Sequence, residues 1–228
     1  MNNPTDIILL SLKVALTATL LMLPLGVFLG WLFSRKRFFG KSLFDGLVNV
    51  PLVLPPVVTG YFLLIVLGPN GVVGKWLQDW LGISLAFNWK AAVLAAGIVS
   101  LPLLVRAVHV AVDAVDPKLE EAARMLRASE WQIFFAITLP LSANGVIAGG
   151  VLAFGRALGE FGATIIFASN IPGKTQTIPL AIFTYINQPD GEAKAQTLVL
   201  VSIVLAYLSI LLNEFLLRRI RYAPSSSN

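Results

Sequence analysis

The sequence of 228 residues contains no cysteine and a single histidine. Without cysteine it can form neither a disulfide nor a thiolate metal site, and one histidine, His109, cannot build an imidazole cluster. Charged side chains are also scarce, at 13% of the residues, whereas a soluble domain carries about 25%. The shortage of charge argues against a water-soluble fold, and the missing ligands predict that the chain holds no metal.

Motifs of acyl transfer and of nucleotide hydrolysis are missing as well. The sequence has no Gly-x-Ser-x-Gly nucleophile turn. The nearest approach to a phosphate-binding loop, at 68–76, has the wrong glycine spacing, and Trp76 stands where serine or threonine is required. We therefore expect no catalytic site and no cofactor in this chain, which cannot hydrolyse a nucleotide by itself.

Long apolar runs are abundant, since 57% of the residues are hydrophobic. A membrane-spanning helix needs roughly 17–25 mostly apolar residues. The runs are continuous, whereas the strands of a membrane barrel alternate between apolar and polar residues. The sequence thus predicts an all-α, polytopic integral membrane protein that forms a single domain over 1–228. Its five predicted transmembrane helices are 7–33, 43–68, 89–112, 142–169 and 195–217.

The distribution of lysine and arginine predicts the orientation. Basic residues gather in 34–41, between the third and fourth spans, and after residue 217. Such segments stay on the cytoplasmic side of a membrane. The N-terminus is then expected outside and the C-terminus in the cytoplasm, in agreement with an odd number of spans. The net charge of +5 is explained as a topology signal, and no nucleic-acid partner is predicted.

Prolines and glycines within the predicted spans indicate how the helices bend and pack. Pro51, Pro55 and Pro56 remove backbone donors, so the second span cannot be a straight helix. We interpret this kink either as the lining of a passage or as ordinary packing. Glycines four residues apart lie on one helix face and predict close contacts between helices. Three such pairs are Gly26 with Gly30, Gly145 with Gly149 and Gly155 with Gly159.

The fourth predicted span contains two opposite charges, Arg156 and Glu160. Four residues apart, they lie on one face of a helix. Charges within a membrane span are costly and are usually paired or turned toward water. Two interpretations stay open: the pair borders a translocation pathway or its gate, or the two charges neutralise each other and seal helices together.

A polar segment at 116–130 separates the third and fourth spans. Asp116 is a favourable N-cap and proline at 117 suits the first helical position, so a helix is predicted over 118–128. Its short length and mixed charge favour docking into the groove of a partner over lying on the bilayer surface. The apolar residues that form one face at helical spacing are Leu119, Ala122, Ala123 and Leu126.

This segment resembles the EAA loop of ATP-binding-cassette importer permeases, in Glu121-Ala122-Ala123 followed by Ile137-x-Leu139-Pro140. The resemblance implies a coupling helix that sits in a cleft of a cytoplasmic ATPase subunit and transmits force without catalysis. The family usually has glycine where this chain has Arg127, so the turn after the helix, or its contact with the ATPase, is expected to differ. The residues expected to couple are Glu120, Glu121, Ala122, Ala123, Leu126 and Arg127.

Three further strings, at 50–61, 156–164 and 169–173, are similar to those of molybdate-importer permeases. The similarity implies a type I importer permease of the bacterial inner membrane that moves molybdate by alternating access. Implied partners are a second copy of this chain, two ATPase subunits that bind ATP and Mg, and an extracytoplasmic oxyanion-binding protein that meets loops 69–88 and 170–194. A dianion needs polar donors along its path rather than a deep cationic trap. Candidates for the pathway or its gate are Thr59, Tyr61, Ser100, Arg156, Glu160 and Thr164.

Several alternatives stay open at this point. Within the importer interpretation, tungstate is nearly indistinguishable from molybdate, and sulfate or thiosulfate is the next candidate. A passive anion channel would leave the segment 116–130 without a purpose. A membrane-embedded enzyme would need converging catalytic groups, and the spans offer only Arg156 and Glu160.

Overall fold

The computed structural model describes residues 3–221, which are mostly helical and contain no strand within that range. The outermost residues of the domain predicted over 1–228 lie outside it. The elements are α1 Pro4–Arg35, α2 Lys41–Val53, α3 Pro56–Leu67, α4 Val72–Leu81, α5 Trp89–Asp113, α6 Pro117–Met125, α7 Glu130–Ile133, the π-helical turn η1 Phe134–Thr138, α8 Leu139–Leu141, α9 Ala143–Leu158, α10 Gly162–Phe167, α11 Ile178–Ile186 and α12 Glu192–Arg221.

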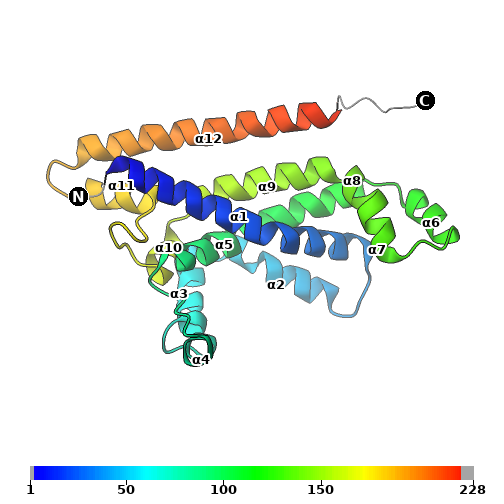
Figure 1. Cartoon of the computed structure of the whole chain (residues 1–228), viewed down its shortest axis with the longest axis horizontal. Helices are drawn as coiled ribbons and strands as arrows, with labels where there is room; N and C mark the ends of the chain where they lie inside the picture. The colour runs from blue at the N-terminus through cyan, green and yellow to red at the C-terminus, as the bar shows by residue number, and fades with distance from the viewer. Residues whose placement is uncertain (1–2, 222–228) are drawn as a thin grey trace.

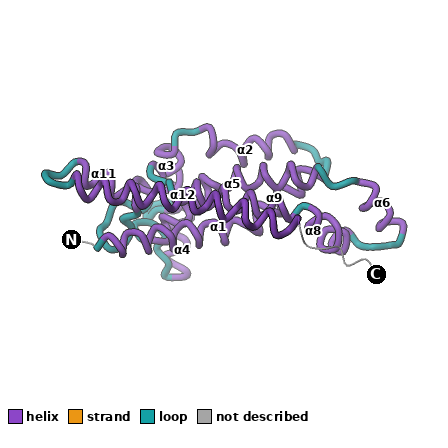
Figure 2. Tube along the Cα trace, turned by 90° about the horizontal axis from the view of Figure 1, so that it is seen from above, coloured by secondary structure: helices purple, strands orange, loops and turns teal. Residues whose placement is uncertain are grey.

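Four long helices, α1, α5, α9 and α12, run lengthwise beside one another, and α6 lies beyond one end of this bundle (Figures 1 and 2). Glycines allow the closest approaches. A Cβ atom on Gly26 of α1 would lie 2.4 Å from Leu104 Cδ2 of α5, and one on Gly145 of α9 would lie 2.1 Å from Ala111 Cβ of α5. The predicted contacts of Gly26 and Gly145 are thus confirmed as packing within one chain, whereas a Cβ on Gly155 would meet nothing within 4 Å and one on Gly159 would meet only the carbonyl oxygen of Gly155 at 3.7 Å.

Three helices, α1, α5 and α12, are individually long and apolar enough to span a membrane, and the total reaches five if each of two bent pairs counts as one span. In the first pair α2 and α3 meet at 114°. Pro51 lies inside α2, and Pro55 and Pro56 form the junction. The predicted break in the second span is therefore confirmed, and 43–68 is two helices.

The fourth predicted span, 142–169, is corrected in two respects. It is preceded by the helical stretch Glu130–Leu141, which meets α9 at 71°. It is also interrupted, because α9 ends at Leu158 and α10 begins at Gly162. The backbone N–H of Ala163 donates to Glu160 Oε1 at 2.8 Å, so this carboxylate satisfies a free donor in the first turn of α10 and stabilises a new helix start.

The segments 69–88 and 170–194, expected to be loops, contain α4 and α11. The α4 helix sits at the tip of α3, away from the long helices (Figure 1). The α11 helix is tied to α1, because the N–H of Ile178 donates to the buried hydroxyl of Ser11 at 2.7 Å. Loop residues thereby join the core of the bundle at one end.

The helix α12 is the least buried of the long helices, with 11% of its most apolar stretch covered by the rest of the chain. Leucines, isoleucines and valines therefore cover its outer surface. In water such a surface would be unstable, whereas hydrocarbon tails solvate it well. The bundle is thus suited to a lipid environment.

Candidate functional site

The segment 116–130 begins with the N-cap that the sequence predicts. Asp116 accepts a hydrogen bond from the N–H of Lys118 at 3.0 Å, and Pro117 occupies the first helical position of α6. The helix ends at Met125, earlier than the predicted limit of 128. A capping box at Ser129 and Gln132 then starts α7, a signal that the sequence carries in the pattern Ser-x-x-Gln.

The early end of α6 is explained by Arg127. Its φ is 61°, in the left-handed region that favours glycine. The N–H of Arg127 bonds to the carbonyl of Arg124 at 2.9 Å, and that of Ala128 bonds to the carbonyl of Ala123 at 3.1 Å. This pair of bonds forms a Schellman turn. Arg127 thus occupies the position where glycine is expected, and it adopts the backbone conformation of a glycine.

One side of α6 is open. Met125 is 86% exposed and Leu126 is 85% exposed, while Leu119 is about half exposed. Glu121 and Ala122 are also exposed, and Ala123 is partly buried. The predicted apolar face is therefore present, and most of it is exposed. Exposed apolar side chains on a short helix are typical of a surface that docks into a partner.

Glu120 differs from its neighbour Glu121, because its side chain is 3% exposed. Glu120 Oε1 lies 2.9 Å from Arg35 Nε at the end of α1 and accepts a hydrogen bond from Thr138 Oγ1 of η1 at 2.7 Å. Arg35 also donates to the carbonyl of Val115 at 2.8 Å. The structure thus directs Glu120 into the chain rather than toward the open side of α6.

A second ion pair group lies beside the first. Glu130 at the start of α7 lies 2.7 Å from Lys36 Nζ and 2.8 Å from Arg124 Nε. The hydrogen bond with Glu130 raises the pKa of Arg124, and the charges of Glu130, Glu120 and Glu121 act in the same direction. Sequence reasoning assigned no site role to Thr138 or Glu130 and treated Arg35 and Lys36 only as topology signals.

The EAA-like residues downstream of α6 lie in a distorted helix. Ile137 is in the π-helical turn η1, and Leu139 with Pro140 begins α8. Proline lacks the N–H that would bond to the carbonyl four residues earlier, so the ladder is disrupted here. A π-helical turn accommodates such a disruption and is frequent at functional sites.

Arg156 and Glu160 form the ion pair that their spacing predicts, at 2.7 Å between Nη1 and Oε2. The Glu160 side chain is 1% exposed and the Arg156 side chain 30%. Glu160 also accepts the N–H of Ala163. The carboxylate therefore has two roles: it pairs with the Arg156 guanidinium of α9, and it caps the start of α10.

The remaining pathway candidates differ in position. Thr59 of α3 is buried, and its hydroxyl has no hydrogen-bond partner among the described residues. Thr164 of α10 is buried. Ser100 of α5 is also buried and donates to the carbonyl of Gly97 at 3.0 Å. Tyr61 is 56% exposed. The structure therefore places three of these hydroxyls inside the bundle and Tyr61 on its surface.

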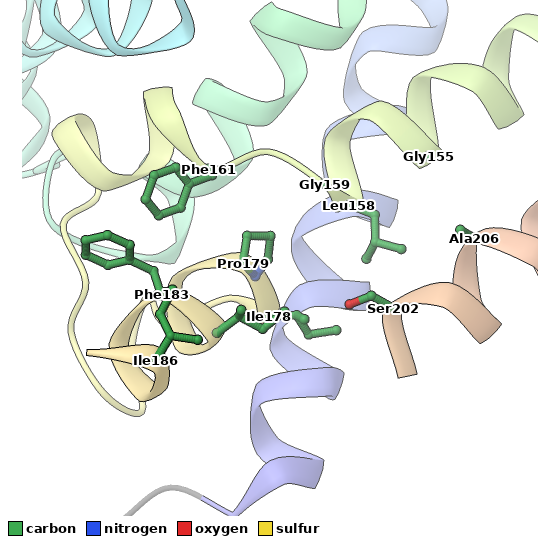
Figure 3. Close-up of a pocket in the computed structure, with 11 residues that line it drawn as sticks. Gly155, Leu158, Gly159, Phe161, Ile178, Pro179, Phe183, Ile186, Ser202 and Ala206 are labelled. Atoms are coloured by element: carbon green, nitrogen blue, oxygen red, sulfur yellow. The ribbon is translucent and has the colours of Figure 1, made fainter. Parts of the chain in front are cut away.

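A pocket of about 490 Å³ lies between α9, α11 and α12 (Figure 3). Phe161, Pro179 and Phe183 form part of its wall, and Ser202 is the only lining residue with a hydroxyl. That hydroxyl donates to the carbonyl of Leu198 at 2.8 Å. The other lining residues that the structure describes have apolar side chains or are glycines, so the pocket suits an apolar occupant.

Within residues 3–221, no group of three or more His, Asp or Glu side chains is arranged to hold a metal ion. The histidine His109 lies 3.1 Å from Asp113, one turn further along α5. His109 therefore already has a partner on its own helix.

Comparison with known sequences gives consistent matches. The family described as "Binding-protein-dependent transport system inner membrane component" matches residues 22–222. The molybdenum transport system permease protein ModB of Haemophilus influenzae is 53% identical over 219 residues, with 96% of each chain covered. ModB of Escherichia coli (strain K12) is 55% identical over 211 residues, with 92% of each covered. The sulfate transport system permease protein CysT of the same strain is 35% identical over 185 residues, which cover 80% of this chain and 66% of CysT.

Solved structures show the same fold at lower identity. A chain of a bacterial alginate ABC transporter, in complex with a pentasaccharide-bound periplasmic protein, matches with a TM-score of 0.75 and 20% identity, covering 96% of this chain and 79% of that one. A chain of the inward-facing MetNI methionine ABC transporter matches with a TM-score of 0.68 and 16% identity, covering 95% and 94%. The fold is that of type I ABC importer permeases, as the sequence predicts. With its match to the family model from residue 22 to residue 222, the chain belongs to the inner-membrane components of binding-protein-dependent transport systems.

Proposed function

We propose that this chain is the permease subunit of an ATP-driven importer of molybdate. The observation that carries the proposal is its identity of 53% and 55%, over nearly the whole chain, to two proteins named as molybdenum transport permeases. The sulfate permease is 35% identical and longer than this chain. Sulfate is therefore a weaker candidate than molybdate, and tungstate is distinguished from molybdate only by experiment.

The energy for transport comes from outside this chain. Two copies of the permease pair in the membrane, and two cytoplasmic ATPase subunits bind ATP and Mg. A binding protein on the outer side delivers the oxyanion. The open side of α6, with Glu121, Met125 and Leu126, fits the cleft of an ATPase subunit. On this proposal the segment 116–130 transmits the closing of the ATPases to the spans, which then alternate between inward-facing and outward-facing states.

The proposed orientation places α6 in the cytoplasm and the N-terminus outside. Its support is that the basic loop after α1 and the segment 116–130 meet at one end of the bundle, where Arg35 and Lys36 pair with Glu120 and Glu130. Both segments contain several lysines or arginines, and short loops with an excess of these residues remain inside even where acidic residues accompany them. The chain is then a multi-pass protein of a bacterial inner membrane.

The proposed pathway uses hydroxyl donors rather than a strong cationic site. Thr59, Ser100 and Thr164 are buried. The Thr59 hydroxyl has no partner among the described residues, whereas the Ser100 hydroxyl would have to leave the Gly97 carbonyl to donate to an anion. Arg156 is already neutralised by Glu160 at 2.7 Å, so it does not present a full positive charge to a passing dianion. A weak, multi-site path allows the ion to leave as well as to enter. Tyr61 lies on the exposed side of α3. We propose it as a gate residue only if a second copy of the chain contacts it there.

Reconstitution tests the proposal directly. The chain, its ATPase and its binding protein are placed in liposomes, and uptake of radiolabelled molybdate is measured with and without ATP. Tungstate, sulfate and thiosulfate serve as competitors. ATP-dependent molybdate uptake that sulfate does not suppress is the expected result. Anion flux through the permease alone, without ATPase or nucleotide, would instead favour a passive channel.

The variant Glu121→Lys tests the role of α6. It reverses an exposed charge on the proposed docking side, so we expect normal membrane insertion and loss of coupling between ATP hydrolysis and uptake. Glu214→Lys is the control, since it reverses another exposed carboxylate, in α12 rather than in α6. Unchanged substrate-stimulated ATP turnover in the Glu121 variant would overturn the assignment of α6.

A further inference from the structure

Three consecutive residues at the end of α1, the last two of the helix and the one that follows it, bond to three different elements. Ser34 donates a short hydrogen bond to Asp113 at the end of α5. Arg35 pairs with Glu120 of α6 at 2.9 Å. Lys36, the residue after the helix, pairs with Glu130 of α7 at 2.7 Å. The sequence separations are 79, 85 and 94 residues, so none of these bonds follows from local structure.

The central bond of the three is protected from water. The Arg35 side chain is 13% exposed and the Glu120 side chain 3%. Glu120 also receives the hydroxyl of Thr138 at 2.7 Å, and Arg35 reaches the carbonyl of Val115 at 2.8 Å. Separating an ion pair in such surroundings costs much free energy, because each charge would remain buried without a partner. Arg35 and Glu120 therefore move together.

We infer that the last turn of α1 is a second attachment of the coupling segment to the membrane bundle, with Arg35 and Glu120 as positioning residues. The inference rests on the proposed function. Without these bonds, α6 would still be joined to its chain neighbours by its two flanking turns, by Arg124 with Glu130 and by Thr138 with Glu120, but it would have no attachment to α1. With them, a displacement of α6 by the ATPase moves α1 as well as α5.

The construction of α1 extends that displacement across the membrane. The helix has 32 residues, which corresponds to a length of about 48 Å. It packs closely along α5, where a Cβ on Gly30 would lie 2.7 Å from Val108 Cβ. Near its other end Ser11 holds the N–H of Ile178 in α11. A displacement of α1 at Arg35 is thus transmitted to α11, at the opposite end of the bundle.

The test measures distances between spin labels in the assembled transporter. The chain has no cysteine, so introduced cysteines are unique labelling sites once the partner subunits are also cysteine-free. One pair, Arg37→Cys with Lys118→Cys, joins the end of α1 to the first turn of α6, away from the residues proposed to dock. A reference pair, Lys118→Cys with Val72→Cys, joins α6 to α4. Labelled chain is diluted with unlabelled chain, so that each complex contains at most one labelled copy.

The expected result is a constant distance in the first pair, with and without ATP, and a changed distance in the reference pair. If the first distance changes with nucleotide as much as the reference distance, the inference is overturned. This measurement needs no substitution of Arg35 or Glu120. A wild-type complex that takes up no molybdate would refute the proposed function, whereas the distances would still test the attachment.

The variant Glu120→Gln gives a functional readout. It removes the charge of the buried carboxylate and leaves the open side of α6 unaltered. We expect normal ATPase binding, a first-pair distance that varies with nucleotide, and a fall of at least about fivefold in molybdate uptake per ATP hydrolysed, the lower end of ordinary coupling effects. An assembled variant with unchanged uptake per ATP and an unchanged distance would overturn the inference.

Thr138 supplies a milder pair of variants in case Glu120→Gln does not assemble. Thr138→Val keeps the shape of the side chain and removes the hydrogen bond to Glu120, so uptake per ATP should fall less than in the Glu120 variant. Thr138→Ser keeps the hydroxyl, so its molybdate uptake per ATP hydrolysed should equal that of the wild type. Equal ratios in the Val and Ser variants would contradict a positioning role for this contact.

Discussion

A Cβ atom on Gly60 of α3 would lie 2.6 Å from the carbonyl oxygen of Ala163 in α10. The two backbones are therefore in direct contact at this point. Thr59 and Thr164, the neighbours of these two residues in the sequence, are both buried. The contact brings the break after α2 and the break before α10 together, and it places two pathway candidates on helices that cannot separate without losing their closest packing.

This contact predicts that Gly60→Ala is destabilising. The added methyl group would meet backbone atoms, which cannot turn aside as a flexible side chain can, so a cost of about 1–3 kcal/mol is expected. Thermal unfolding of the purified permease in detergent measures it. Gly155→Ala is the control, because nothing lies within 4 Å of its Cβ position and alanine favours the helix. Equal stability of both variants would contradict the close contact.

The turn after α6 predicts the opposite effect for Arg127→Gly. Arg127 has a φ of 61°, and glycine adopts that conformation without the steric cost of a Cβ atom. A gain of about 1 kcal/mol is expected, visible as a higher midpoint of thermal unfolding. Arg127→Ala keeps the Cβ atom and should give no gain. If the alanine variant were as stable as the glycine variant, the effect would come from loss of charge rather than from the backbone.

Arg156 and Glu160 form a buried ion pair, so we expect the stability effect of replacing one of them to depend on whether the other is present. Arg156→Leu leaves the Glu160 carboxylate buried without its cation, at a cost of about 3–5 kcal/mol. The double variant with Glu160→Gln should recover much of that loss, because the amide oxygen can still accept the N–H of Ala163. Unfolding of the single and double variants measures the coupling.

The same double variant separates the two interpretations of the pair. Normal molybdate uptake by the assembled double variant would show that the charges seal helices together. Loss of uptake with intact assembly would support a place on the pathway or its gate. The loss of stability in the double variant is compared with the sum of the losses in Arg156→Leu and Glu160→Gln. If the two are equal, the residues are not coupled.

The link between α1 and α11 predicts that Ser11→Ala is destabilising. It would leave the N–H of Ile178 buried without an acceptor, at a cost of about 1–3 kcal/mol. Ser209→Ala is the matched control, because the Ser209 hydroxyl bonds only to the Leu205 carbonyl of its own helix among the interactions described. Similar unfolding midpoints for the two variants would contradict the importance of the link.

The sequence was sufficient for those features that depend on local pattern. Long apolar runs predicted α1, α5 and α12, since a span needs only length and apolar character. Pro51, Pro55 and Pro56 predicted the break between α2 and α3, because proline removes backbone donors. Asp116 and the proline after it predicted the start of α6. Each of these signals acts within a few residues of its effect.

Other features depend on partners that are distant in the sequence. The break after α9 contains no proline and is supported by the Glu160 side chain, which the sequence could suggest only as an ion-pair partner. The inward direction of Glu120 depends on Arg35, 85 residues away. The short helices α4 and α11 were not predicted, because they lie in segments that connect the spans and such segments were expected to be loops. The helical spacing of Val72, Trp76 and Trp80 did indicate α4.

The bonds at the end of α1 also restrict how that helix can move. Successive residues of a helix are turned by about 100° from each other, so Ser34 and Arg35 leave α1 in different directions toward Asp113 and Glu120. Rotation of α1 about its own axis would stretch one of these bonds as it relaxed the other. Tilting of α1 together with α5 and α6 keeps both intact, so the helix is free to rock with its neighbours and is prevented from turning alone.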